Sequence, residues 1–343
     1  MSGKPRIRII GTGGTISASG KSAADAAYEI GKVDVSELLA AVSGLDQLAT
    51  FESESLFALG SEDLGPAHWI ALARRIRALS ESDEVDGIIV THGTDTLEEC
   101  AFFLDLVLAG NKPVVLTAAM RAATALSADG PANIYQATLA CSLACSSRTP
   151  HRGGVRVVLN GLVIPGWQTV KTDSLALEAF KAYPGAAAGR IIGDRLQVYG
   201  QALRSPLAGR FQDLVDASAP LPPVDIAYVR GGCGDAPLTA LQDRGYQGIV
   251  IAAFGAGTLP EAMAKLAQEM AGAGCAIVIS SRVAKVSVVP QTMTVRDVSG
   301  VVAARILNPQ KSALLLSLCL ASGFGCTEIE QHFDLFASPT IAD

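Results

Sequence analysis

The sequence predicts an α/β protein with two domains: a larger N-terminal one with a mostly parallel sheet flanked by helices, and a smaller C-terminal one. Short runs of aliphatic and β-branched residues alternate with helix-length segments along most of the chain, which is the pattern of βαβ units. The length, 343 residues, is enough for two domains. Hydrophobic residues make up 49% of the chain and charged residues 17%, a balance typical of a well-buried α/β enzyme.

The first half of the chain supplies these elements in a regular order. Ile7–Ile10 is rich in β-branched residues and predicts a buried parallel strand. Trp69–Leu79 alternates apolar and basic groups at helical spacing, so a helix is expected there. The strand Asp86–Val90 follows. The helix Leu97–Leu108 then carries Leu, Phe and Val on successive turns, and Pro113–Thr117 is the next strand.

The alternation continues through the helix Asn133–Ser142 and the strand Val155–Leu159. A turn-rich, weakly periodic stretch then runs from about residue 183 to residue 223 and ends in Ala-Pro-Leu-Pro-Pro. Proline breaks both helices and central strands, so this stretch predicts a linker. We place an N-terminal catalytic domain at residues 1–204, the linker at 205–223 and a C-terminal domain at 224–343.

The C-terminal domain repeats the same pattern, which again predicts an α/β structure. The expected strands are Ile226–Val229, Gly248–Ala252 and Ala276–Ser280, and the expected helices are Leu259–Met270 and Gln310–Leu320.

Charge and hydropathy argue against several classes of function. The formal net charge is −6 and no basic run is interleaved with aromatic residues, so no nucleic-acid partner is expected. No run of 18 or more apolar residues suggests a membrane span. The N-terminus lacks the apolar region and small-residue cleavage site of a secretory signal. We therefore expect a cytoplasmic protein, unless a leader has been removed.

The cysteines and histidines do not predict a metal site. The 7 cysteines have no CxxC spacing, and the 4 histidines form no HExxH or HxH pattern. Cys141 and Cys145 lie four residues apart, on one face of a helix, but metal ligation would need further ligands nearby. Reduced, mostly buried thiols are the expected state.

Two threonine-bearing stretches are the strongest functional signal. Residues 10–17 read Ile-Gly-Thr-Gly-Gly-Thr-Ile-Ser, and residues 87–99 read Gly-Ile-Ile-Val-Thr-His-Gly-Thr-Asp-Thr-Leu-Glu-Glu. Each follows a predicted strand and so places a threonine at a strand's carboxyl end, where open α/β sheets build their sites. A threonine is a weak nucleophile until its proton is removed. Two threonines converging with Asp95 and a lysine would provide a hydroxyl nucleophile and its activating relay.

A dinucleotide site is an alternative interpretation of Gly11–Gly14, and the sequence disfavours it. The Gly-x-Gly-x-x-Gly fingerprint needs glycine where this chain has Ile16. No helix is expected next, and no acidic residue ends a clear second strand about twenty positions on. The glycines should instead clear space beside Thr15 through close backbone approach or positive φ. The small-residue loop between Ser17 and Lys32 could act as a lid or be an ordinary surface loop.

Each candidate residue also has a purely structural interpretation when taken alone. Thr15 could end a strand, and Thr94 or Asp95 could cap the helix that follows. Lys171 could be a surface lysine and Tyr28 a packed aromatic. These interpretations weaken because the residues occur in a recognisable order along the chain.

That order resembles the bacterial-type L-asparaginase family. The family's two signatures are a Thr-Gly-Gly-Thr-Ile segment near the N-terminus and a His-Gly-Thr-Asp-Thr segment about eighty residues later, which match Thr12–Ile16 and His92–Thr96 here. The resemblance covers almost the whole chain. It continues through Gly60–Asp63, Phe103–Asp105, Lys112–Val115, Ala119–Arg121, Ser127–Pro131, Lys171–Thr172, Ser280–Val283 and Leu307–Lys311.

The resemblance implies a hydrolase that cleaves the side-chain amide of L-asparagine without a metal or cofactor; L-glutamine is left open as a second substrate. Thr15 matches the family's nucleophile, and Tyr28 matches the tyrosine that activates it. Thr94, Asp95 and Lys171 match a second cluster, which orients the amide and activates a water molecule. Sequence alone leaves open which threonine attacks, and Thr15 is favoured because it lies beside the expected lid.

The resemblance also implies how substrate is held and how the protein assembles. Ser61 and Glu62 match the pair that binds the α-carboxylate and α-amino groups. Gly14, Thr94 and Asp95 complete the expected substrate-binding set. A homotetramer made of two tight dimers is implied as well.

Physical chemistry is compatible with these roles. A lysine near a threonine hydroxyl favours loss of the hydroxyl proton, while Asp95 holds the ammonium in place. Attack on an amide gives a tetrahedral intermediate whose oxyanion needs N–H donors, which glycine-rich turns can supply from the backbone. Loss of ammonia leaves an acyl-threonine that water hydrolyses.

The chain departs from the family pattern at the α-amino end of the substrate. There the neighbouring subunit usually contributes Asn or Ser and a Glu, but ungapped counting places Gly232 and Met293 at these positions. In a shifted register, Asp235 or Asp297 would serve instead. Otherwise the pocket is retuned toward an amide whose α-amino group is absent, acylated or differently placed, or it binds asparagine weakly.

Two other functions are compatible with the fold. The glutamine-amidase subunit of a tRNA-dependent amidotransferase shares it, but that function calls for an extra N-terminal domain and a basic RNA-facing surface. A non-catalytic amino-acid-binding homologue is the second. Retention of the five matched catalytic residues argues against loss of turnover, although fold alone does not establish function. L-Asparagine remains the leading substrate.

Overall fold

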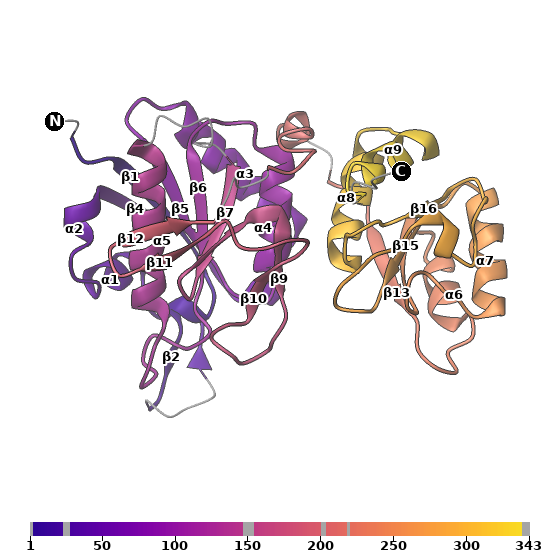
Figure 1. Ribbon diagram of the computed structural model, residues 1–343, viewed down its shortest axis with the longest axis horizontal. Coiled ribbons are helices and arrows are strands. Elements are labelled where there is room, and N and C mark those ends of the chain that lie inside the picture. The colour runs from indigo at the N-terminus through magenta and orange to yellow at the C-terminus, as the bar shows by residue number, and fades with distance from the viewer. Residues whose placement is uncertain (1–2, 23–27, 147–153, 200–203, 218–219, 338–343) are drawn as a thin grey trace. The chain divides into compact units, whose positions relative to one another are not determined.

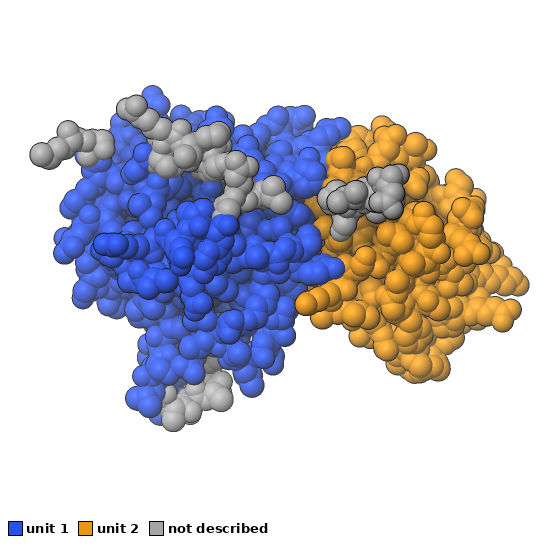
Figure 2. Space-filling model, in the orientation of Figure 1, with its two compact units in different colours: residues 1–216 blue, residues 217–343 orange. Residues whose placement is uncertain are grey.

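The computed structural model describes residues 3–22, 28–146, 154–199, 204–217 and 220–337. The chain forms two compact units that divide between residues 216 and 217 (Figure 2). This division lies inside the predicted linker. Residues before it pack on the first unit, because the backbone N–H groups of Gly209 and Phe211 donate to the carbonyls of Asp105 and Leu106.

A mostly parallel sheet forms the centre of the first unit, as predicted. Within the described residues its strands are β1 (Arg6–Gly13), β4 (Thr50–Leu59), β5 (Gly87–Thr91), β6 (Pro113–Thr117), β7 (Gly154–Leu159), β8 (Leu162–Pro165), β11 (Gly189–Ile192) and β12 (Arg195–Val198). Their order is β12-β11-β8-β7-β6-β5-β1-β4. The strands from β7 to β4 pair in parallel, and β8, β11 and β12 add an antiparallel extension.

Helices cover both faces of this sheet (Figure 1). One face carries α1 (Val35–Ala40), α2 (Leu45–Leu48) and α5 (Gly130–Ser146), and the other carries α3 (Pro66–Glu81) and α4 (Leu97–Val107). Every residue of β5 and β6 is buried. Their largely aliphatic sequences follow from this burial, because a strand covered on both faces favours apolar side chains along its whole length.

Short elements connect the sheet to its helices. They are η1 (Thr15–Ser17), β2 (Ser19–Gly20), β3 (Tyr28–Glu29), η2 (Ser61–Asp63), η3 (Gly166–Gln168), β9 (Thr169–Lys171), β10 (Phe180–Ala182) and η4 (Gln212–Val215). β9 and β10 pair with each other in a separate two-stranded sheet, and so do β2 and β3.

Four strands of the main sheet, β4, β8, β11 and β12, were not predicted from the sequence. β4 is an edge strand whose residues are mostly half-buried or exposed, so its sequence lacks an aliphatic run. The prediction that residues after Tyr183 are irregular was wrong for β11 and β12, which form an antiparallel hairpin. Gly193 opens the two-residue turn between them with φ 61°. This Gly-Asp pair between two short alternating runs was the signal that could have revealed the hairpin.

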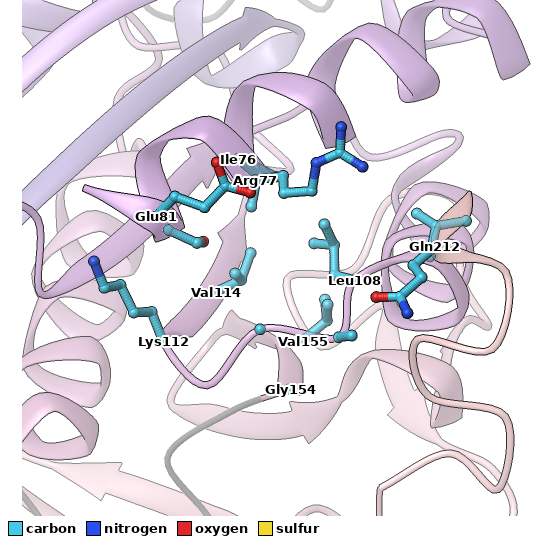
Figure 3. A pocket seen from close by; sticks show the side chains of 13 residues that line it. Ile76, Arg77, Glu81, Leu108, Lys112, Val114, Gly154, Val155 and Gln212 are labelled. Atoms are coloured by element: carbon cyan, nitrogen blue, oxygen red, sulfur yellow. The ribbon is translucent and has the colours of Figure 1, made fainter. Parts of the chain in front are cut away.

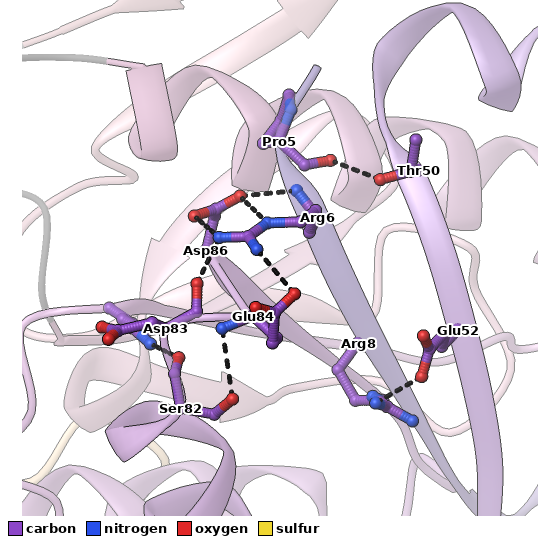
Figure 4. A network of polar contacts seen from close by, with 10 residues as sticks. Pro5, Arg6, Arg8, Thr50, Glu52, Ser82, Asp83, Glu84 and Asp86 are labelled. Atoms are coloured by element: carbon purple, nitrogen blue, oxygen red, sulfur yellow. Dashed lines mark hydrogen bonds and ion pairs between the residues drawn. The ribbon is translucent and has the colours of Figure 1, made fainter. Parts of the chain in front are cut away.

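Salt bridges fix the amino end of β1 (Figure 4). The Arg6 guanidinium donates to both Asp86 carboxylate oxygens and to Glu84, and Arg8 pairs with Glu52. The hydrogen bond from Arg6 lowers the pKa of Asp86. These pairs are largely exposed, so each contributes at most about 1 kcal/mol to stability. They join β1 to its two neighbouring strands at the end opposite the threonine-bearing loops.

The second unit is a smaller α/β structure, as predicted. Over residues 217 and 220–337 its parallel sheet has the order β13-β14-β15-β16. α6 and α7 pack on one face and α8 on the other (Figure 1). The elements are β13 (Val224–Tyr228), α6 (Ala236–Gln242), β14 (Gly248–Ala253), α7 (Glu261–Gly272), β15 (Ala276–Ser281), η5 (Pro290–Thr292), β16 (Val301–Ala303), α8 (Pro309–Ala321) and α9 (Cys326–Asp334).

Candidate active site

Three neighbouring strands of the first unit carry the candidate residues on the loops at their carboxyl ends. β1 lies between β4 and β5, and its loop contains Gly14 and Thr15. The loop after β4 contains Ser61 and Glu62, and the loop after β5 contains Thr94 and Asp95. The chain leaves β1 toward β4 on one side and returns to β5 on the other. This is a topological switch point, the position at which open α/β sheets bind ligands.

Glycines allow these loops to approach each other closely. Gly13 and Gly14 have φ angles of 98° and 81°, in the region that favours glycine. The N–H of Gly14 donates to the carbonyl of Leu59, at 2.9 Å, so the β1 loop is joined to β4. On the other side a Cβ atom at Gly14 would lie 2.2 Å from the Cα of Gly93. The expected close approach and positive φ are therefore present, and the backbone that approaches is the protein's own.

Ser61 connects the β4 loop to the β5 loop. Its hydroxyl oxygen accepts the backbone N–H of Asp95 at 3.0 Å, and its carbonyl accepts the hydroxyl of Thr96 at 2.7 Å. Ser61 is buried, whereas Glu62 is exposed. The Glu62 carboxylate folds back over Gly60, where an added Cβ would lie 2.3 Å from Oε1. The hydroxyl hydrogen of Ser61 stays able to donate, since the Ser61 oxygen is the acceptor in the contact with Asp95.

Lys171 brings a fourth segment to the same place. Its Nζ donates to Thr94 Oγ1 at 3.0 Å and to Asp95 Oδ1 at 2.7 Å. The Lys171 side chain is 17% exposed and that of Asp95 is 60% exposed, so the cluster lies at the boundary between protein and solvent. The structure thus assembles Thr94, Asp95 and Lys171 as the sequence suggested, from segments 76 and 77 residues apart.

Glu98 is a member of this cluster that the sequence analysis did not single out. It is 2% exposed and belongs to the first turn of α4. Its Oε2 accepts the backbone N–H of Lys171 at 2.5 Å. A carboxylate three residues after Asp95, in the first turn of a predicted buried helix, was the available signal.

Thr15 and Tyr28 form the other half of the predicted site. Thr15 begins η1, directly after Gly14, and is 6% exposed. The structure describes the backbone of Tyr28, which pairs with Gly20 in the ribbon of β2 and β3, but its side chain lies outside the description. Residues 23–27 of the expected lid lie outside it too.

His92 supports the β5 loop from inside the protein. It is fully buried, and its Nδ1–H donates to the carbonyl of Gly93 at 2.8 Å. Desolvation lowers the pKa of His92 to about 4, so the ring is neutral at physiological pH. A neutral, buried ring of this kind packs the loop rather than exchanging protons with a substrate.

Gly232 and Met293 lie in the second unit in different surroundings. Met293 is 4% exposed and belongs to the hydrophobic core, where its Cγ lies 3.2 Å from a Cβ built at Gly257. Gly232 is exposed with φ 74°, and a Cβ there would have no neighbour within 4 Å. Asp235 and Asp297, the shifted-register candidates, are both exposed.

A cavity of about 290 Å³ lies in another part of the first unit (Figure 3). Its apolar lining includes Leu108, Val114 and Val155, near the amino ends of β6 and β7. Its basic side chains are engaged by the protein itself: Arg77 pairs with a carboxylate and Lys112 donates to a backbone carbonyl. The candidate residues lie at the other end of the strands, so we do not assign this cavity to them.

The described residues contain neither a helix that could span a membrane nor a candidate metal cluster. None of their helices is both long and apolar enough to cross a lipid bilayer. No group of three or more His, Cys, Asp or Glu side chains among them is arranged to hold a metal ion.

Comparison with known proteins gives consistent matches over both units. The family model described as Asparaginase, N-terminal matches residues 6–204, and the one described as Glutaminase/Asparaginase C-terminal domain matches residues 223–333. L-asparaginase 2 of Escherichia coli strain K12 is 37% identical over 336 residues, 97% of this chain and 93% of that protein. A probable periplasmic L-asparaginase of Haemophilus influenzae is 36% identical over 338 residues, 97% of this chain and 93% of that protein. The crystal structure of a probable cytoplasmic L-asparaginase from Campylobacter jejuni has a TM-score of 0.86 and 33% identity, covering 96% of this chain and 99% of that one.

Proposed function

This chain belongs to the asparaginase family, and from that premise we propose that it hydrolyses the side-chain amide of L-asparagine to aspartate and ammonia. The observation that carries the proposal is the contact of Lys171 Nζ with both Thr94 Oγ1 and Asp95 Oδ1. It lies at the switch point of the sheet, where such enzymes bind substrate. L-Glutamine is a second substrate to be tested.

In the proposed reaction Thr15 Oγ1 attacks the amide carbon. The hydroxyl loses its proton to a base, for which Tyr28 is our candidate, and backbone N–H groups of the glycine-rich turns stabilise the oxyanion. The C–N bond then breaks, the nitrogen takes up a proton and leaves as ammonia, and the acyl group stays on Thr15. Water hydrolyses this ester and returns the proton to the threonine.

Thr94, Asp95 and Lys171 activate the water in this scheme. The Lys171 ammonium, 3.0 Å from Thr94 Oγ1, stabilises negative charge on that oxygen. Thr94 can then relay a proton as the water attacks the ester: its oxygen takes the proton of the water, and its own hydroxyl proton goes to the departing Thr15 oxygen. Asp95 fixes the ammonium through a charge-assisted hydrogen bond of 2.7 Å.

Ser61 and Glu62 hold the other end of the substrate in this proposal. The Ser61 hydroxyl accepts from the Asp95 N–H, which directs its own hydrogen to another acceptor such as the α-carboxylate. The exposed carboxylate of Glu62 is a partner for the α-ammonium. Gly14 contributes by leaving room beside Thr15.

An ammonia-release assay against L-asparagine, L-glutamine, D-asparagine and N-acetyl-L-asparagine tests the function. We expect L-asparagine to give the highest kcat/KM. A higher value for the N-acetylated amide would identify the alternative substrate class, an amide with a modified α-amino group. Tight binding of one compound without ammonia release from any of them would instead identify a non-catalytic amino-acid-binding homologue.

The burial of Met293 favours a retuned α-amino site and determines how it should be tested. Glutamate at position 293 would place a carboxylate in a hydrophobic core, at a cost of several kcal/mol. Asparagine at 232 fits, because the position is open and Asn tolerates a positive φ. We expect Gly232→Asn to raise kcat/KM for L-asparagine about tenfold, the effect of one hydrogen bond to a charged group. An unchanged kcat/KM, measured by the same assay, would argue that Gly232 takes no part in recognition.

We also propose a cytoplasmic homotetramer built from two dimers. The family resemblance supports the assembly, and the name of the Campylobacter jejuni relative supports the location, whereas the Haemophilus influenzae relative is named periplasmic. A fully active monomer in sedimentation velocity, or a periplasmic fraction holding the activity, would refute the respective half of this proposal.

A further inference from the structure

Lys171 ends strand β9, which, within the described residues, hydrogen-bonds to another strand on one side only. Among the strands that the structure describes, β9 pairs with β10 alone, in a two-stranded antiparallel sheet. The N–H of Thr172 points toward β10 and donates to Ala179 at 2.7 Å. Successive N–H groups of a strand point in opposite directions, so the N–H of Lys171 faces away from β10. There it meets the carboxylate of Glu98 at 2.5 Å.

Glu98 is well placed to hold that N–H rigidly. The residue is 2% exposed, and its helix α4 is buried over ten of its eleven residues. Its position in the first turn of α4 also suits a negative charge, because the N-terminus of a helix carries partial positive charge. A hydrogen bond from a backbone amide to a buried carboxylate is stronger than one between neutral groups.

We propose that Glu98 is the positioning residue of Lys171. It fixes the Lys171 main chain against the start of α4, which directly follows the loop that carries Thr94 and Asp95. The ammonium of Lys171 then lies within hydrogen-bonding distance of both residues. The proposal rests on the proposed function in one respect only, the role of Lys171 in catalysis. The structural half stands on the contact between Glu98 Oε2 and Lys171 N.

The geometry explains why a main-chain contact governs the position of Nζ. The side chain of Lys171 has four rotatable bonds, and its ammonium donates to Thr94 and Asp95. Thr94 and Asp95 can hold the ammonium only if the Cα of Lys171 lies at the right distance from them. Releasing the main chain by 1 Å would move the ammonium out of position, and misplacement on that scale can lower rates about 100-fold.

Two substitutions of Glu98 separate the effect of its side-chain length from the effect of its charge. Glu98→Asp keeps the charge but shortens the side chain by one methylene, so the carboxylate no longer reaches the N–H. Glu98→Gln keeps an acceptor oxygen at the original reach. We expect kcat for L-asparagine to fall about 100-fold in the aspartate variant with KM within a few-fold of wild type. The glutamine variant should keep at least about a third of kcat.

Asp105 is a matched control on the same helix. It is also buried, at 3% exposure, and its carboxylate accepts the backbone N–H of Val155 at 3.5 Å. Asp105→Asn alters a buried carboxylate bound to a backbone N–H, away from Lys171. We expect a changed thermal stability with kcat retained. Equal losses of kcat in Asp105→Asn and Glu98→Asp would show that Glu98 acts only through the stability of α4, which would overturn the proposal.

Two measurements complete the test. Hydrogen–deuterium exchange of the peptide that contains Lys171 should be faster in Glu98→Asp than in wild type, and this readout needs no enzymatic activity. Unchanged exchange would overturn the structural half of the proposal. In a Lys171→Met background Glu98→Asp should lower the residual rate no further, because residues that act through one another are non-additive. Full additivity would overturn it, whereas a wild-type protein without amidase activity would refute the proposed function alone.

Discussion

Thr15→Ala and Thr94→Ala should each lower kcat for L-asparagine by at least about 10³-fold, since loss of one member of a catalytic unit removes most of its rate enhancement. The two variants should fail at different steps. Without Thr15 no acyl-enzyme can form. Without Thr94 the water is not activated, so the acyl group should accumulate on Thr15. Acid quenching followed by mass spectrometry of the intact protein distinguishes the two cases.

Thr117→Val is the matched control for these threonines. Thr117 ends β6 and is fully buried, with its hydroxyl donating to the carbonyl of Val158 at 2.8 Å. Its loss should cost about 1 kcal/mol of stability through one hydrogen bond and leave kcat unchanged. An acyl group detected on Thr15→Ala would contradict the assignment of the nucleophile and transfer it to Thr94.

Gly14→Ala should damage both stability and turnover. A non-glycine residue at φ 81° is strained, and its Cβ would meet the Cα of Gly93 at 2.2 Å and the N of Gly93 at 2.4 Å. Backbone cannot move aside as a flexible side chain can. The two costs together amount to about 3 kcal/mol or more. We expect a lower urea midpoint and at least a 100-fold fall in kcat, since the β1 and β5 loops would separate.

Gly193→Ala separates the two contributions. Gly193 also has a positive φ, 61°, but a Cβ there meets no atom within 4 Å. This variant should lose about 1 kcal/mol from the left-handed conformation alone and keep its activity. Equal urea midpoints for the two alanine variants would show that the approach of Gly14 to Gly93 carries no stability.

The buried strands were predictable from the sequence, and the reason is burial itself. β5 and β6 are covered on both faces, so their sequences are largely aliphatic runs, and β5 ends at a loop of the candidate site. Edge elements gave no such signal. β4 has mixed polarity because one of its sides faces solvent, and β12 is mostly exposed.

Site residues that directly follow a strand of the main sheet were predictable from the sequence. Residues that reach the site from outside the main sheet were not. Thr94 and Asp95 follow β5, so their place at the sheet edge was expected. The contact of Lys171 with both depends on β9, which belongs to no regular βαβ unit. Only the family resemblance had suggested Lys171. Glu98 contacts a backbone N–H, so no partner side chain marks it in the sequence, and its place in the first turn of a buried helix was the only signal.

The separate sheet of β9 and β10 has a consequence for how the protein responds to heat. A two-stranded ribbon is marginally stable by itself, whereas the main sheet is held by many more strands and two layers of helices. Opening of the ribbon breaks only the ribbon's own contacts, including the one between Glu98 and Lys171, and therefore costs less free energy than global unfolding. Such an opening withdraws Lys171 and leaves the rest of the first unit folded. Heat would then inactivate the protein reversibly at temperatures below its melting transition.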